Sequence, residues 1–160
     1  MPEHSYQTLL QWTGNKGRGT KDYRAYDRAY KIEVTGKPAI LGSSDPAFRG
    51  DRTKYNPEEL LVASLSSCHM LWYLHLCSEA KVIVVNYQDR AIGKMSEAKD
   101  GSGKFIEVLL QPKVTVTTNS NLERAKQLHH KAHQFCFIAN SVNFPVLCQP
   151  SIFISATEAN

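Results

Sequence analysis

The sequence predicts an α+β domain with a mainly antiparallel sheet, a buried central helix and a second, amphipathic helix. Three observations lead to this fold class. Strand-like segments occur in runs linked by turn signals, one helical segment is apolar on nearly every face, and a second helical segment carries one apolar stripe. The chain has 160 residues, the usual length of one domain, so we expect a single domain over residues 1–160.

The first part of the chain indicates two strands and a long loop. Residues 6–13 have the composition of a strand, and a glycine-rich turn follows at residues 14–20. Apolar side chains alternate over residues 25–34, which predicts a second strand. Residues 42–55 are polar and contain Ser-Ser-Asp-Pro, so we expect an ordered loop there.

The central helix has a clear start signal. Asn56 is a preferred N-cap, Pro57 suits the first helical position, and Glu58 and Glu59 suit the positive end of the helix dipole. The segment from residue 60 to residue 76 is almost entirely apolar or small, which is typical of a buried helix and too short to span a bilayer. One small sheet covers only one side of such a helix, so we expect a second subunit on the other side.

Two long strands are predicted after this helix, at residues 82–95 and 104–118. The Asp-Gly-Ser-Gly sequence at residues 100–103 lies between them and favours a hairpin turn. Residues 151–156 have the pattern of a closing strand.

A second helix is predicted from a capping box formed by Ser120 and Glu123. Its apolar side chains recur at helical spacing and its charged side chains lie on the opposite side. The apolar stripe consists of Leu122, Ala125, Leu128 and Ala132.

Charge and hydropathy exclude several classes of protein. The formal net charge is +4, but the charges are scattered and no run of five like charges occurs, so nucleic acid is not an expected partner. The first 20 residues do not resemble a signal peptide, and no membrane-spanning stretch is expected. We therefore expect a cytoplasmic protein without a membrane partner.

The four cysteines are the main candidates for chemistry. Their spacings fit neither a disulfide framework nor a Cys-x-x-Cys zinc site, so each is a buried small side chain or a reactive thiol. Cys77 follows Cys68 by nine residues, which places it on the opposite side of the helix and about 13.5 Å along it. We interpret Cys77 and Cys148 as structural and keep Cys68 and Cys136 as the candidates.

The local sequences around these two cysteines resemble the OsmC/Ohr family of osmotically inducible and organic hydroperoxide resistance proteins. The resemblance rests on Asn-Pro-Glu-Glu-Leu-Leu at residues 56–61, Ala-Ser-Leu-Ser-Ser-Cys at residues 63–68, and a second cysteine after a second helix. The segment Cys-Phe-Ile-Ala-Asn-Ser at residues 136–141 is similar to the second-cysteine region, with phenylalanine where the most familiar form has proline. In order and spacing, the resemblance covers roughly residues 6–157.

The resemblance implies an intertwined homodimer and a cysteine-based peroxidase without haem or another cofactor. Cys68 would attack an organic hydroperoxide or hydrogen peroxide and become a sulfenic acid, and Cys136 would condense with it to a disulfide. An external dithiol or lipoyl-type reductant would then restore both thiols.

The family also implies a carboxylate and an arginine that support the reactive thiolate. Glu58 matches the carboxylate position, but ten helical residues place it about 15 Å from Cys68, so it would serve the site of a second subunit. Arg49 is the preferred arginine, followed by Arg18 and Arg52. Such a guanidinium would favour the thiolate and bind the peroxide.

Two other functions compete with this interpretation. His129 and His133 are four residues apart on the second helix and Cys136 follows one turn later, so the three side chains could bind a metal ion. Alternatively, the chain is a non-catalytic domain that binds a small hydrophobic ligand.

Overall fold

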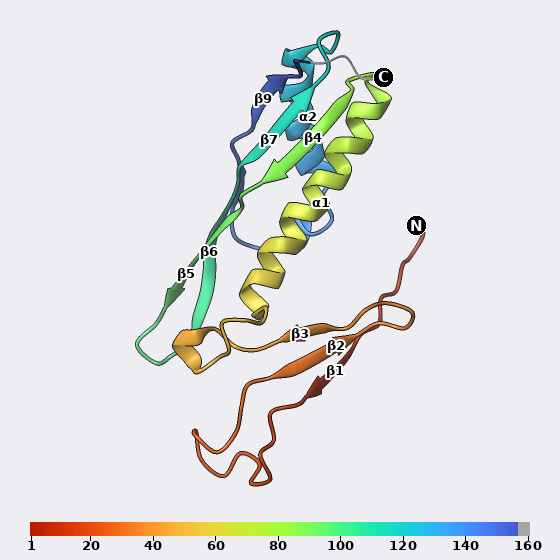
Figure 1. Cartoon of the computed structure of the whole chain (residues 1–160). Coiled ribbons are helices and arrows are strands. Elements are labelled where there is room, and N and C mark those ends of the chain that lie inside the picture. Colours follow the sequence, from red (N-terminus) through yellow and green to blue (C-terminus); the bar gives the residue numbers. More distant parts are fainter. Residues whose placement is uncertain (157–160) are drawn as a thin grey trace. The chain divides into compact units, whose positions relative to one another are not determined.

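The computed structural model describes residues 1–156, which form two compact units. The first unit comprises Met1–Leu60 and contains one three-stranded sheet. The second begins at Leu61 and contains two further three-stranded sheets. Helix α1 (Pro57–Glu79) begins in the first unit and continues through the second, which also contains helix α2 (Leu122–Phe135) (Figure 1). The α+β class is thereby confirmed.

The first unit is built on an antiparallel sheet in the order β1-β2-β3. Its strands are β1 (Leu9–Trp12), β2 (Tyr30–Glu33) and β3 (Ile40–Gly42), which are shorter than the predicted segments. Gly42 pairs with Tyr30, and a side chain at this glycine would displace the tyrosine ring that packs over it. The short helix η1 (Pro46–Phe48) follows, capped by Asp45.

The predicted start of α1 is confirmed by a reciprocal capping box. The Asn56 side chain accepts a hydrogen bond from the Glu59 backbone N–H at 2.8 Å, and the Glu59 carboxylate accepts one from the Asn56 N–H at 3.1 Å. Two backbone donors at the helix start are therefore satisfied by side chains, which fixes the point where α1 begins.

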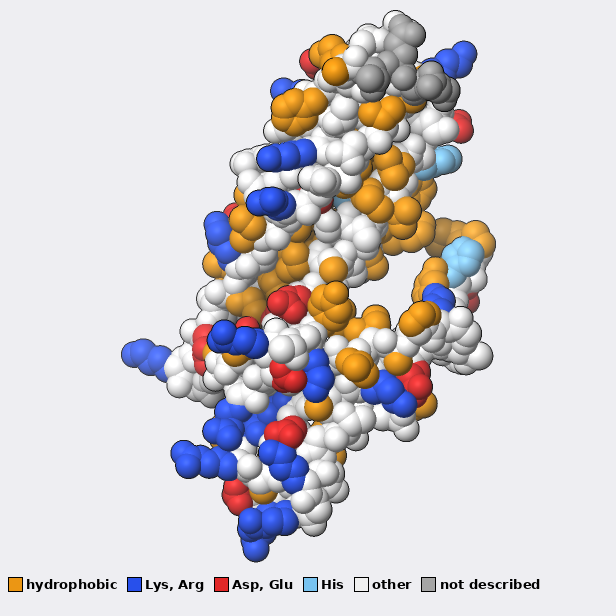
Figure 2. Space-filling model, in the orientation of Figure 1, with side chains coloured by type: hydrophobic (Ala, Val, Ile, Leu, Met, Phe, Trp, Pro, Cys, Tyr) orange, Lys and Arg blue, Asp and Glu red, His pale blue; other side chains and the backbone are white. Residues whose placement is uncertain are grey.

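The helix is longer and less buried than the sequence predicts. It has 23 residues, and by length and composition alone it is long enough to cross a membrane, a test that the core helix of a soluble protein also passes. Five of its residues are buried, whereas Leu71 is 63% exposed. Figure 2 shows hydrophobic side chains at the surface along α1. One side of α1 packs within its own chain, and the other exposes apolar side chains, as expected for a helix that its own sheet covers on only one side.

The two long strands of the prediction are each divided in two. The strands that result are β4 (Val84–Asp89), β5 (Ile92–Glu97), β6 (Gly103–Leu110) and β7 (Pro112–Val116). The division coincides with a contact between the two strands, since the Gln111 N–H donates to the Asp89 carboxylate at 2.7 Å and Pro112 has no N–H to offer. The strands therefore change sheets at this point.

The sheets of the second unit are mixed. The order in one is β4-β7-β9 and in the other β5-β6-β8, where β8 is Val146–Cys148 and β9 is Ser151–Ile154. The β4–β7 and β5–β6 pairs are antiparallel, whereas β8 and β9 pair in parallel with β6 and β7. The expectation of one mainly antiparallel sheet is thus corrected to three small sheets, two of them mixed.

The predicted hairpin turn between β5 and β6 is confirmed. The Asp100 carboxylate accepts hydrogen bonds from the backbone N–H and the hydroxyl of Ser102, at 2.9 and 2.7 Å. Gly101 has φ of 84°, a conformation that glycine adopts without strain.

Helix α2 forms as predicted, but its cap is Asn121 and not Ser120. The Asn121 side chain accepts a hydrogen bond from the Arg124 N–H at 2.9 Å. The Ser120 hydroxyl is occupied elsewhere, because it accepts a hydrogen bond from the Ile83 N–H at 3.0 Å. The predicted capping box is therefore replaced by a single cap one residue later.

The main core of the second unit lies between α1, α2 and β7. A smaller cluster is centred on Leu65, Val108 and Leu110. The buried members of the main cluster are Tyr73, Leu76, Cys77, Val82, Val114, Val116, Ala125, Leu128 and Ala132. Three of the four predicted stripe residues of α2 belong to this cluster, and Leu122 is exposed.

Candidate functional site

Cys68 lies near the middle of α1, where its side chain is half-buried. A position within a long helix gives the thiol a fixed location relative to the side chains one turn away. Trp72 is one of these, because it follows Cys68 by four residues and so lies on the same helix face.

Cys136 is the residue at which α2 ends. Its extended backbone, with φ of −67° and ψ of 107°, turns the chain out of the helix. The thiol is 1% exposed, and the Ala139 N–H donates to its sulfur at 3.5 Å. The 3-10 helix η2 (Ala139–Ser141) follows directly, so the cysteine is held between two helical segments.

The structure brings the two predicted cysteines together. The side chains of Cys68 and Cys136 are neighbours that act on each other, and both are free thiols. Burial raises the pKa of the Cys136 thiol to about 11, and the contact with Cys68 raises it further. Cys136 is therefore a neutral thiol at pH 7, in direct contact with a more accessible one.

Aromatic side chains surround this pair of cysteines. The Trp72 ring stacks on Phe135 with a centroid distance of 5.1 Å and meets Phe137 edge-on at 5.8 Å. Phe135 and Phe137 flank Cys136 in the sequence and are 42% and 63% exposed. We call Trp72, Phe135 and Phe137 the aromatic wall. It is an apolar surface that could contact the organic part of a ligand.

The two predicted supporting residues lie in the other unit. Arg49 has φ of 64° and ends η1, with its guanidinium 5.9 Å from the centre of the Tyr23 ring. Glu58 is half-buried in the first turn of α1. Burial raises the pKa of Tyr30, and the negative charge of Glu58 raises it further. Arg49 and Glu58 form no ion pair with each other among the described residues. Their roles at Cys68 stay predictions.

Neither of the two alternative arginines is a stronger candidate than Arg49 for supporting the Cys68 thiolate. Arg18 and Arg52 are exposed loop residues. Arg28 was missed by the sequence analysis and is anchored within the first unit, where it donates to the carbonyls of Tyr26 and Tyr23 at 2.7 Å each. No sequence signal distinguishes Arg28, because its partners are backbone atoms brought near by a turn.

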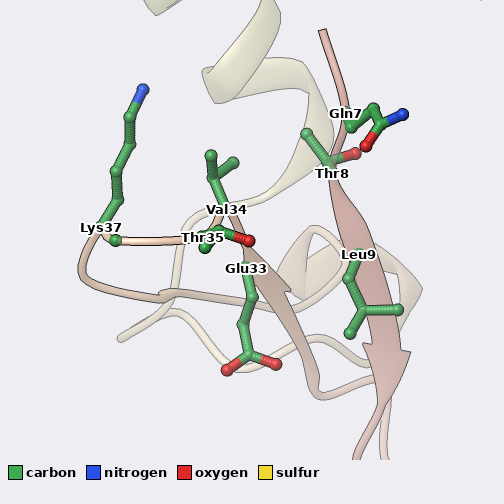
Figure 3. A pocket seen from close by; sticks show the side chains of 8 residues that line it. Gln7, Thr8, Leu9, Glu33, Val34, Thr35 and Lys37 are labelled. Carbon is green, nitrogen blue, oxygen red and sulfur yellow. The ribbon is translucent and has the colours of Figure 1, made fainter.

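Hollows in the first unit do not resemble a reactive site. One, of about 470 Å³, lies beside β1 and the end of β2 and has no cysteine or histidine in its lining (Figure 3). Another, of about 270 Å³, is lined in part by Arg49 and Asp51. The residues around the first are Gln7, Thr8, Leu9, Glu33, Val34, Thr35, Gly36 and Lys37.

The predicted metal ligands are not grouped as expected. Among residues 1–156, the group suited to a metal ion is His69, His129 and Cys148. The set of His129, His133 and Cys136 is therefore corrected, because His129 faces α1 and β8 while Cys136 contacts Cys68. The sequence did not reveal the new group, since its members come from three separate elements.

The fold and the two neighbouring cysteines define an OsmC-like protein. The family model described as OsmC-like protein matches residues 50–150, and the chain belongs to this family. This confirms the resemblance. No match was found among curated proteins.

Solved structures agree with the family assignment. An OsmC-like protein of unknown function from Vibrio cholerae is 33% identical, with a TM-score of 0.82 over 94% of this chain and 100% of that one. An organic hydroperoxide resistance protein from Elizabethkingia anophelis is 18% identical, with a TM-score of 0.67 over 96% and 100%. One from Legionella pneumophila is 20% identical, with a TM-score of 0.66 over 94% and 99%. The last two share the fold with this chain.

Proposed function

We propose that this chain is a thiol-dependent peroxidase that reduces organic hydroperoxides, and also hydrogen peroxide, through Cys68 and Cys136. The observation that carries the proposal is the direct contact between a half-buried thiol on α1 and a buried thiol at the end of α2. Membership of the OsmC-like family and a fold shared with organic hydroperoxide resistance proteins support it.

The cycle needs one peroxide and one external dithiol. The Cys68 thiolate attacks a peroxide oxygen, the O–O bond breaks, and the leaving oxygen takes a proton and departs as an alcohol or water. The resulting sulfenic acid reacts with the Cys136 thiol, which forms an S–S bond and releases water. A dithiol, for example a lipoyl-type one, supplies two electrons and two protons to restore both thiols.

The elevated pKa of Cys136 separates its role from that of Cys68. At pH 7 this buried group is almost wholly a thiol, so it does not compete with Cys68 for peroxide. It reacts when a sulfenic acid forms on the neighbouring Cys68, and its proton then leaves with the sulfenic hydroxyl as water.

The aromatic wall supports an organic substrate. Phe135 and Phe137 present exposed apolar surface next to the cysteines, where an alkyl or aryl group of a hydroperoxide gains from leaving water. Hydrogen peroxide has no such group, so we propose that it is the poorer substrate.

A homodimer would complete this site. The exposed apolar side chains along α1 favour a second subunit at this face (Figure 2). In such a dimer, Glu58 of one subunit and an arginine, Arg49 in our proposal, would support the Cys68 thiolate. We place the protein in the cytoplasm, where reducing conditions keep its cysteines as thiols.

Peroxide consumption by matched cysteine variants tests the proposal. With cumene hydroperoxide and dihydrolipoamide, Cys68→Ser should lose turnover by at least a hundredfold, whereas Cys77→Ser should keep it. Cys77 is the matched control because it is also a free thiol on α1 but lies in the main core. Equal loss in both variants, or full activity in Cys68→Ser, contradicts the proposal, and absence of turnover by the wild type favours a domain that binds a hydrophobic ligand.

A further inference from the structure

Three metal-ligating side chains meet in the second unit, separate from the pair formed by Cys68 and Cys136. They are His69 from α1, His129 from α2 and Cys148 from the end of β8. Nε2 of His69 lies 3.0 Å from Nδ1 of His129, and the Cys148 sulfur lies 3.7 and 3.9 Å from these atoms. One nitrogen from each ring and one sulfur therefore surround a common point.

Both histidine rings of this group are buried. The rings are 1% and 2% exposed, and Nδ1 of His69 and Nε2 of His129 have no hydrogen-bond partner among the described residues. An ion held by Nε2 of His69 and Nδ1 of His129 would leave these two outer nitrogens as N–H groups. The Tyr73 ring stacks on His129 with centroids 3.8 Å apart.

The protonation states of the cluster suit metal ligands. Burial lowers the pKa of His69 to about 4 and that of His129 to about 3, so both imidazoles are neutral at pH 7. A metal-bound histidine must be neutral. Burial raises the pKa of the Cys148 thiol to about 12, and a coordinated ion would displace its proton.

We propose that His69, His129 and Cys148 bind one transition-metal ion of the class that prefers nitrogen and thiolate ligands, zinc or monovalent copper. The point equidistant from the three ligand atoms lies about 2.1 Å from each of them. This equals the usual Zn–N distance of about 2.0–2.1 Å and is about 0.2 Å short of the usual Zn–S distance. Small side-chain movements therefore suffice to set the bond lengths.

Without the ion, the two rings hold each other by a hydrogen bond. They are parallel within 5° with centroids 5.3 Å apart, so the facing nitrogens point at each other and share one proton. Binding would turn each ring so that its lone pair meets the ion, and the shared proton would move to the outer nitrogen of the ring that carries it. The Cys148 thiol releases its proton to solvent, so one proton leaves for each ion bound.

Charge and access are also consistent with this site. The Asp89 carboxylate acts electrostatically on both His69 and Cys148, and it would offset the positive charge that a zinc thiolate retains. Its orientation is fixed by hydrogen bonds from the Ser66 hydroxyl and the Gln111 N–H. Cys148 is half-buried, so the cluster approaches the surface at this residue.

Metal titration of the chelator-stripped full chain tests the proposal. Zinc is added against a chromophoric chelator, and monovalent copper is added in a separate anaerobic titration against a copper chelator. We expect one ion per chain for the wild type and at least tenfold weaker binding for His129→Gln and Cys148→Ser. The ion that binds more tightly relative to its chelator identifies the metal.

Matched variants separate this site from other ligands. His130→Gln alters the exposed neighbour on α2, and Cys77→Ser alters another free cysteine, so both should bind one ion as the wild type does. Cys68→Ser should also keep one ion, which makes the result independent of the proposed peroxidase function. Cobalt gives a second readout, because a thiolate-to-cobalt charge-transfer band should appear in the wild type and vanish in Cys148→Ser.

Circular dichroism shows whether each variant is folded. If His129→Gln does not fold, the test relies on Cys148→Ser, which changes a single atom. Absence of binding by the wild type overturns the proposal. Binding that survives Cys148→Ser but is lost in Cys68→Ser overturns it as well, because the ion would then be held by the redox cysteines.

Discussion

Acid should destabilise the protein through its buried histidines, and His129 offers the sharpest test. Burial, together with His69 and His130, lowers the pKa of His129 to about 3, whereas an unfolded histidine titrates near 6.5. Because the folded-state pKa is the lower one, the unfolded chain takes up protons first as the pH falls. Stability is therefore unaffected above pH 6.5 and declines between pH 6.5 and about 3.

The size of this effect follows from the pKa difference. Each pKa unit corresponds to about 1.4 kcal/mol, so between pH 7 and pH 4 the free energy of unfolding should fall by about 3 kcal/mol through His129 alone. Replacing His129 with glutamine removes a group that titrates only in the unfolded chain over this interval. Between pH 7 and pH 4, the free energy of unfolding of His129→Gln should therefore fall by about 3 kcal/mol less than that of the wild type.

Urea unfolding of metal-stripped protein at several pH values, followed by far-ultraviolet circular dichroism, measures this difference. His75→Gln is the control, because His75 is exposed on α1 and should show the acid loss of the wild type. If the free energy of unfolding of His129→Gln falls on acidification as much as that of the wild type, the reasoning is refuted.

Three further predictions concern the site and the helix that carries it. Cys136→Ser should stop cycling after one turnover, and mass spectrometry should then find Cys68 oxidised to sulfinic acid; sustained turnover would show that Cys136 does not resolve the sulfenic acid. Trp72→Ala should raise KM for cumene hydroperoxide several-fold and leave that for hydrogen peroxide unchanged, and an equal change for both would count against the aromatic wall. Asn56→Ala should cost about 1 kcal/mol in urea unfolding, since the cap of α1 is lost, whereas Asn56→Ser should cost less; equal costs would argue against the capping role.

Features with a local cause were predictable from the sequence. The start of α1 depends on Asn56 and Glu59, three residues apart, and the turn at Gly101 depends on its immediate neighbours. The start of α2 was displaced by one residue, because Asn121 and Ser120 are both good caps and a distant partner, Ile83, binds the Ser120 hydroxyl. Local patterns therefore specify an element, and tertiary contacts choose between adjacent caps.

Features that join distant segments were not predictable in this way. The contact of Cys68 with Cys136 was expected from a family resemblance and not from spacing. The cluster of His69, His129 and Cys148 joins residues 60 and 79 positions apart, and no periodic pattern relates them. The change of partner strands at Asp89 likewise depends on a side chain that binds the backbone 22 residues away.

The central claim is that Cys68 and Cys136 form one redox centre. Mass spectrometry of the reduced protein, before and after one equivalent of cumene hydroperoxide and without added reductant, tests it most directly. The account predicts a loss of two hydrogens and a disulfide-linked pair of peptides that contain these two cysteines. An unchanged mass with four free thiols, or a disulfide that involves Cys77 or Cys148, would contradict it.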